Sequence, residues 1–153
     1  MIGRRTSPVV PLDQVPPADT SAYRPVVLVV DDESAIADTL TEILSRSGYA
    51  AMAAYDANDA LENVLLTPPE LLITDVMLPG MSGIELAITV RRIFPDCKIL
   101  LFSGQASTAD LLASAKQDGH HFTLLNKPIH PRDLLAFVSD TLKHGQQVGA
   151  HAG

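Results

Sequence analysis

Cysteine occurs once in the sequence, at Cys97, so an internal disulfide and a cysteine-based metal site are both excluded. Because Cys97 begins an apolar run, we expect it to pack in the core. No apolar run approaches the ~20 residues that a membrane-spanning helix needs. Arg4 and Arg5 near the start are not followed by an apolar stretch of signal-peptide length. We therefore expect a cytoplasmic protein with no membrane segment.

Basic residues are also scarce. There are 11 lysines and arginines against 18 aspartates and glutamates, which gives a formal net charge of −7. This balance disfavours direct binding to nucleic acid or to anionic membranes, both of which reward basic surfaces. The glycines form neither a GxxxxGK[ST] nor a GxGxxG pattern, so no nucleotide site is expected. A protein or small-molecule partner is favoured.

The composition divides the chain into three parts. Residues 1–24 contain four prolines among small and polar residues and predict a disordered tail. Residues 25–144 form the one region with regular apolar patterns, and they predict a single domain. Residues 145–153 predict a flexible C-terminal tail, because the apolar pattern ends near Lys143.

Within the domain, apolar runs of strand length alternate with amphipathic stretches of helical period. The expected strands are 26–30, 50–54, 71–73, 98–102 and 122–125, and the expected helices are 34–47, 57–66, 82–94, 108–118 and 131–143. Five strand–helix pairs at this spacing predict an α/β fold with a parallel sheet covered by helices on both faces. In such folds the carboxyl ends of the strands share one edge, where ligands bind.

Polar side chains follow four of these strands. Asp31 and Asp32 come after the first strand, Asp75 ends the third, Ser103 follows the fourth, and Lys127 lies just past the fifth. The three carboxylates and one ammonium leave a formal charge of −2 in a small cleft. Two like charges about 4 Å apart repel by about 4 kcal/mol at an effective dielectric near 20.

Two arrangements would relieve this repulsion. A divalent cation would balance the charge, and oxygen ligands with few protein contacts suit Mg²⁺. A proton shared between carboxylates is the alternative, but it leaves Ser103 and Lys127 without a role. With Mg²⁺, the set is suited to phosphoryl transfer: Asp75 attacks, Lys127 neutralises the phosphoryl oxygens, and Ser103 donates a hydrogen bond to them.

Four segments together resemble the receiver domain of two-component response regulators. They are VLVVDDE at 27–33, TDVMLPGMSG at 74–83, LFSG at 101–104 and NKP at 126–128. The resemblance implies a flavodoxin-like (βα)5 fold with strand order 2-1-3-4-5. It also implies phosphorylation at Asp75, Mg²⁺ ligation by Asp31, Asp32, Asp75 and the backbone carbonyl of Met77, and phosphoryl sensing by Ser103 and Lys127. A cis Lys127–Pro128 bond is expected as well.

Some positions depart from the pattern of that family. Leu124 stands where an aromatic residue often takes part in switching, and Phe122 lies two residues further from Lys127. Met77 and Gln105 occupy positions that tune the lifetime of the phosphoryl group. Neither carries a carboxylate that could activate water, so we expect slow self-hydrolysis.

The resemblance implies a stand-alone response regulator that takes its phosphoryl group from a histidine kinase or a histidine phosphotransfer protein. It would signal to a downstream protein through helix 4, strand 5 and helix 5, a surface that could also form a homodimer. Three alternatives stay open: a Mg²⁺-dependent phosphatase with an aspartyl nucleophile, a receiver that binds partners without phosphorylation, and a flavin protein. The phosphatase commonly needs an aspartate where Met77 stands. His120, His121 and His130 are interpreted as loop residues rather than metal ligands.

Overall fold

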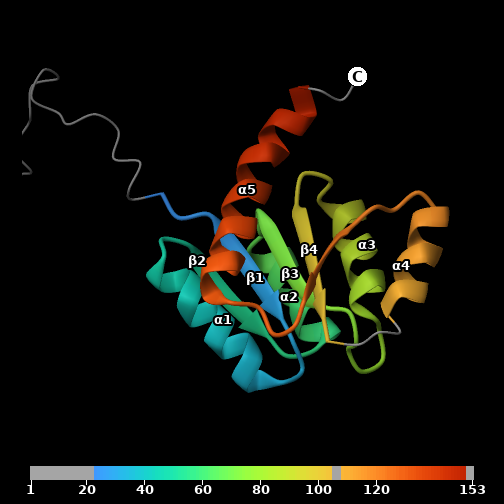
Figure 1. The fold of residues 1–153 in the computed structure, drawn as a ribbon, viewed down its shortest axis with the longest axis horizontal. Helices are drawn as coiled ribbons and strands as arrows, with labels where there is room; N and C mark the ends of the chain where they lie inside the picture. The colour runs from blue at the N-terminus through green and yellow to red at the C-terminus, as the bar shows by residue number, and fades with distance from the viewer. Residues whose placement is uncertain (1–22, 105–107, 151–153) are drawn as a thin grey trace, which may run out of the picture.

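The computed structural model describes residues 23–104 and 108–150, with side chains for residues 23–104 and 109–143. Five parallel strands form one sheet in the order β2-β1-β3-β4-β5 (Figure 1), which confirms the predicted α/β fold. The strands are β1 (Val26–Val30), β2 (Ala50–Ala54), β3 (Leu71–Asp75), β4 (Lys98–Ser103) and β5 (Thr123–Asn126).

Helices cover both faces of the sheet. They are α1 (Ser34–Arg46), α2 (Ala57–Leu66), α3 (Gly83–Ile93), α4 (Thr108–Gln117) and α5 (Pro131–Ala150). Buried side chains of α1 and α5 pack on one face, and those of α2, α3 and α4 pack on the other. Figure 1 shows α4 beside the β4–β5 end of the sheet, at the opposite end from β2.

The central strands are apolar on both faces because each face has its own core. Val27 and Val29 of β1 pack toward α1 and α5, whereas Leu28 and Val30 pack toward the other three helices. Side chains alternate along a strand, so an unbroken aliphatic run fills both cores at once. This explains why the central strands are unbroken runs of apolar residues rather than alternating apolar and polar residues.

Side chains close the N-terminal ends of two helices. Asp56 accepts a hydrogen bond from the backbone N–H of Asp59 at 2.7 Å, and Ser82 accepts one from Glu85 at 3.1 Å. Each bond satisfies a backbone donor that has no partner within the helix. Because Ser82 caps α3, Asp75 is not needed for that role.

Most element ends agree with the sequence prediction to within a residue. β3 ends at Asp75 as predicted, β4 continues to Ser103, and β5 covers Thr123–Asn126 rather than 122–125. The largest difference is α5, which continues to Ala150 although the apolar pattern ends near Lys143. Extending an existing helix costs far less than starting one, so the turn before Lys143 can be propagated through a sequence of low intrinsic preference.

The predicted N-terminal tail falls almost wholly on residues 1–22, which lie outside the part of the chain that the structure describes. Residues 151–153 and Gln105 also lie outside it. Within the described ranges, no helix combines the length and the apolar character that crossing a bilayer would require.

Candidate functional site

The two acids Asp31 and Asp75 are neighbours because their strands are neighbours. Asp31 directly follows β1 and Asp75 ends β3, and the two strands pair with Val30 opposite Thr74. Oxygens of Asp31, Asp32 and Asp75 all lie within 4.8 Å of one another. Asp31 is fully buried, Asp75 is nearly so, and Asp32 is exposed. The structure thus brings the predicted acidic set together.

Lys127 joins the acids from the other side of the sheet edge. Its Nζ donates to Asp31 Oδ2 at 2.8 Å and to Asp75 Oδ2 at 3.0 Å. The backbone N–H of Lys127 donates to the carbonyl of Ser103 at 3.0 Å, which continues the β4–β5 pairing. The Lys127–Pro128 bond is cis, as expected.

Ser103 is the last residue of β4 and is buried. It lies one position beyond Phe102, which pairs with Asp75 across β3 and β4. The serine is therefore on the same edge as the acids and the lysine. Its role in phosphoryl sensing stays a prediction.

Backbone donors hold the two buried carboxylates in place. The N–H of Glu33 donates to Asp31 Oδ1 at 2.8 Å, and the N–H of Met77 donates to Asp75 Oδ1 at 3.2 Å. Each buried carboxylate therefore accepts from Lys127 with one oxygen and from the main chain with the other. The contact of Met77 with the site is made by its N–H, and ligation by its carbonyl stays a prediction.

Burial and charge act in opposite directions on the site. Burial raises the pKa of Asp75 above its ordinary value, although hydrogen bonds from Lys127 and Met77 oppose the shift. Burial alone would lower the pKa of Lys127, but its hydrogen bonds to Asp31 and Asp75 raise it overall. The lysine therefore stays protonated between the two acids, where it offsets part of their repulsion.

The acid set fits a magnesium ion. The donors are carboxylate oxygens, their positions are close enough to share one cation, and Asp32 is exposed where a hydrated ion could approach. Mg²⁺ prefers oxygen ligands and retains several waters, so a site with few protein ligands suits it. Asp31, Asp32 and Asp75 are the side chains that would hold it.

Gly83 is a residue whose importance for the site was missed from the sequence. A Cβ on Gly83 would lie 1.9 Å from the carbonyl oxygen of Asp75, far inside contact distance. The N–H of Gly83 also donates to the carbonyl of Val76 at 2.7 Å. Only glycine lets the start of α3 approach the acceptor strand this closely. The sequence signal for this close approach was a glycine directly after the helix-capping Ser82.

Phe122, the aromatic residue nearest in sequence to the usual switch position, contacts His120 and Arg91. Phe122 stacks with His120 at a ring-centroid distance of 6.3 Å, and the guanidinium of Arg91 lies 4.5 Å from its ring centre. Leu124 is half-buried and packs against the core beneath α3 and α4. His130 accepts a hydrogen bond from the N–H of Arg132 at 3.1 Å, at the start of α5.

The parallel sheet has the strand order of ligand-binding doubly wound folds, and its carboxyl edge carries a buried aspartate beside two further acids and a lysine. The family profile of the response regulator receiver domain matches residues 27–139. The chain belongs to the response regulator receiver domain family of two-component signalling.

Solved structures agree with this assignment. A CheY-like receiver domain protein from Methanospirillum hungatei JF-1 is 28% identical with a TM-score of 0.74, over 82% of this chain and 98% of that one. The receiver domain of an HD domain-containing protein from Pseudomonas fluorescens Pf-5 is 29% identical with a TM-score of 0.75, over 82% and 99%. NtrX from Brucella abortus is 26% identical with a TM-score of 0.74, over 85% of this chain but 29% of that one.

Proposed function

We propose that this receiver domain accepts a phosphoryl group on Asp75 from a phosphohistidine of a histidine kinase or a histidine phosphotransfer protein. The observation that best supports this proposal is that Lys127 forms ion pairs with both Asp75 and Asp31 at a buried edge of the sheet. A purely structural ion pair needs one acid, whereas this edge collects three.

In the proposed reaction, a carboxylate oxygen of Asp75 forms a bond to phosphorus while the bond from phosphorus to the donor imidazole nitrogen breaks. Lys127 lies within hydrogen-bond reach of the acceptor and neutralises charge on the transferred oxygens. Bound Mg²⁺ would supply further neutralisation of that charge. The N–H of Met77 orients Asp75 by holding its other oxygen. The domain would thus promote only its own phosphorylation and dephosphorylation.

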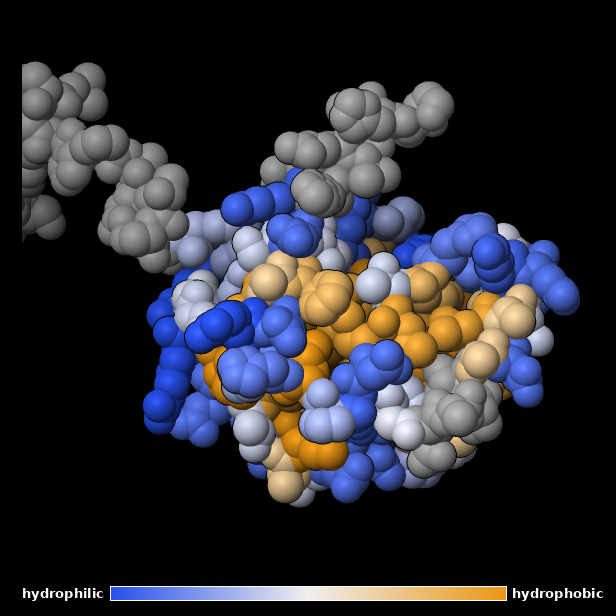
Figure 2. Space-filling view, viewed as in Figure 1, coloured by the Kyte–Doolittle hydropathy of each residue, from blue (hydrophilic) through white to orange (hydrophobic). Residues whose placement is uncertain are grey.

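The signal would leave through the surface formed by α4, β5 and α5. Figure 2 shows apolar side chains gathered between the positions of α5 and α4. α4 and α5 each expose a large apolar side chain, Leu111 and Phe137, with 39% and 42% of its surface accessible. A downstream protein or a second copy of the chain could cover this surface. In this scheme, Ser103 and Lys127 follow the new phosphoryl oxygens and shift the surface between two arrangements.

The domain would act in the cytoplasm and signal by protein contact or phosphorelay rather than by binding nucleic acid. The net charge of −7 disfavours nucleic-acid binding. We further propose that hydrolysis of the phosphoryl group is slow, because Met77 and Gln105 carry no carboxylate. Loss of the group within seconds of removing the donor would contradict slow hydrolysis.

One experiment tests the phosphorylation itself. The full chain is incubated with acetyl phosphate, with and without Mg²⁺, and the intact protein is weighed by mass spectrometry. A single phosphoryl adduct that depends on Mg²⁺ and is absent in Asp75→Asn is expected. Asp96→Asn, at the opposite ends of the strands, serves as the control and should still be phosphorylated. An adduct that persists in Asp75→Asn would refute the assignment, and steady turnover of phosphate esters would indicate a phosphatase instead.

A further inference from the structure

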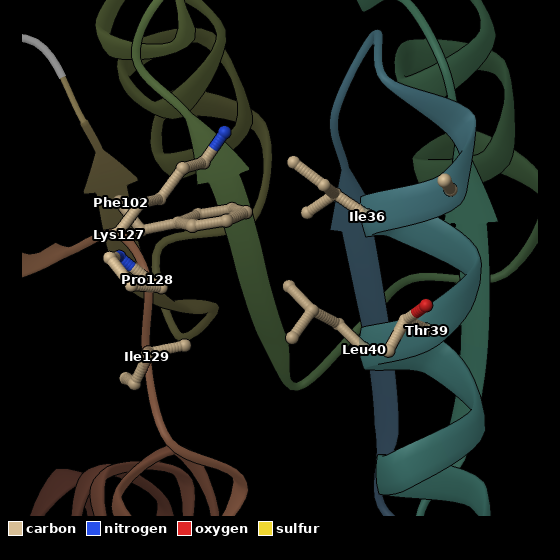
Figure 3. A pocket seen from close by; sticks show the side chains of 8 residues that line it. Ile36, Thr39, Leu40, Phe102, Lys127, Pro128 and Ile129 are labelled. Carbon is tan, nitrogen blue, oxygen red and sulfur yellow. The ribbon is translucent and has the colours of Figure 1, made fainter.

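The ring of Phe102 lies against the ammonium group of Lys127. The distance from Lys127 Nζ to the centre of the ring is 4.7 Å, within the range of a cation–π interaction. Phe102 is 2% exposed, so the ring is fixed by its surroundings. Figure 3 shows the lysine side chain passing over the ring, with both residues on the same wall of a groove.

The fold places the ring there through strand register. Phe102 pairs with Leu125 across β4 and β5, and Lys127 follows Leu125 by two positions. Phe102 therefore projects toward α1 and α5, where it packs in the core with Leu125 and Leu134. The ring and the lysine stem meet because both point to this face of the sheet.

The groove beside them gives the lysine room to move away from the acids. It has a volume of about 540 Å³ and lies between α1 and the segment that joins β5 to α5. Ile36 and Leu40 of α1 line the opposite wall (Figure 3). Two carboxylates hold the ammonium on one side, and the Phe102 ring is the one aromatic group that the described structure places against it.

We infer that Phe102 is a positioning residue that holds Lys127 at the phosphoryl acceptor. This inference rests on the proposed phosphorylation of Asp75. The ring attracts the ammonium group electrostatically and takes up none of its N–H donors in a conventional hydrogen bond. The donors of Lys127 therefore stay available for the carboxylates. Lys127 can then exchange a carboxylate for a phosphoryl oxygen while it stays over the same ring. An aliphatic side chain of similar size fills the space but lacks the negative ring face.

Stepwise fluorination of the ring separates this role from packing. Phenylalanine with one, two or three ring fluorines is incorporated at position 102 of the full chain, which weakens the negative face with little change of shape. The initial rate of phosphorylation by acetyl phosphate with Mg²⁺ should fall with each fluorine, by roughly fivefold in total. The same replacements at Phe94 are the control and should leave the rate unchanged. A rate that falls in Phe102→Leu but ignores fluorination would reduce Phe102 to packing and overturn the inference.

A second measurement does not depend on phosphorylation. The unfolding equilibrium in urea is compared for fluorinated and ordinary Phe102, in the native background and in Lys127→Met. Fluorination should raise the unfolding constant roughly fivefold when Lys127 is present and should have no such effect in Lys127→Met. Equal effects in both backgrounds would overturn the inference. If the native protein forms no adduct, the proposed function fails, and this measurement still decides whether the ring holds the lysine.

Discussion

The centre of the sheet and its β5–α4 end differ sharply in packing. Every residue of β3 is buried, and α3 buries five of its residues. In β5 only Leu125 is buried, and among the α4 side chains that the structure describes only Ala115 is. The acids Asp31 and Asp75 belong to the first region, whereas Lys127 follows β5 in the second.

This difference separates Asp75, the proposed phosphoryl acceptor, from the β5–α4 end of the sheet, which would respond to phosphorylation. Asp75 ends a closely packed strand, so its side chain would be preorganised for the proposed phosphoryl transfer. The end of the sheet that contains Lys127 has few buried contacts, and lightly packed segments open at lower free-energy cost. We expect a domain of this kind to hold its acceptor still and to change shape at β5 and α4.

The largest loss of stability is expected when a side chain is added at Gly83, in the closely packed centre of the sheet. In Gly83→Ala the new Cβ would collide with the carbonyl of Asp75, and backbone cannot yield as a flexible side chain can. We expect a loss of about 3 kcal/mol in the free energy of unfolding, measured in urea, at the upper end of the usual cost of overpacking.

Gly104→Ala is the matched control at the β4–α4 end. Among the described residues, its Cβ would meet the Lys127 Cβ alone, at an ordinary contact distance of 3.6 Å. The change should stay within about 0.5 kcal/mol. Equal losses in the two variants would show that the approach of α3 to β3 is not tight.

A pair of leucine truncations compares the two regions directly. Leu72 is fully buried in β3, whereas Leu112 of α4 is half-buried against the same core. Leu72→Ala should cost about 3 kcal/mol because it leaves a cavity that the strands cannot close. Leu112→Ala should cost about 1 kcal/mol, since it loses only part of its buried area. Urea denaturation measures both, and similar costs would contradict the difference in packing.

Magnesium should stabilise the central region through the acids alone. A ligand that binds only the folded protein adds about 2.7 kcal/mol at 100 times its dissociation constant. We expect this gain with Mg²⁺ and expect its removal by a chelator to reverse it. Asp32→Asn should abolish the gain, and Asp96→Asn should keep it. A gain that survives in Asp32→Asn would place the cation elsewhere.

The acid set was predictable because strand ends are readable in the sequence. Aliphatic runs that end at Asp31 and Asp75 predict two strands of a parallel sheet, and the topology of such sheets then brings the acids to one edge. The position of Lys127 followed from the same rule. The strand order itself came from the resemblance of the motifs rather than from periodicity.

The features that were not predictable depend on contacts rather than on pattern. The approach of Gly83 to Asp75 depends on how the loop between them turns back, and the stacking of Phe102 on Lys127 depends on strand register. No periodicity in the sequence encodes either contact. The start of β5 was missed by one residue because Phe122 is apolar enough to begin a strand. In the fold it turns instead toward Arg91 of α3.

The smallest expected effect concerns the contact between Arg91 and Phe122, which links the centre of the sheet to its β5–α4 end. Arg91 of α3 lies over the Phe122 ring and donates to the carbonyl of His121 at 3.4 Å, just before β5. Burial lowers the pKa of Arg91, yet the guanidinium remains charged because its ordinary pKa is so high.

Arg91→Met keeps the length of the stem and removes the cation, so it should lower the free energy of unfolding by about 1 kcal/mol. Amide hydrogen exchange should rise in β5 and remain unchanged in β3. Arg92→Met, an exposed neighbour, is the control. Exchange that rises equally in β3 and β5 would mean that the two regions open together.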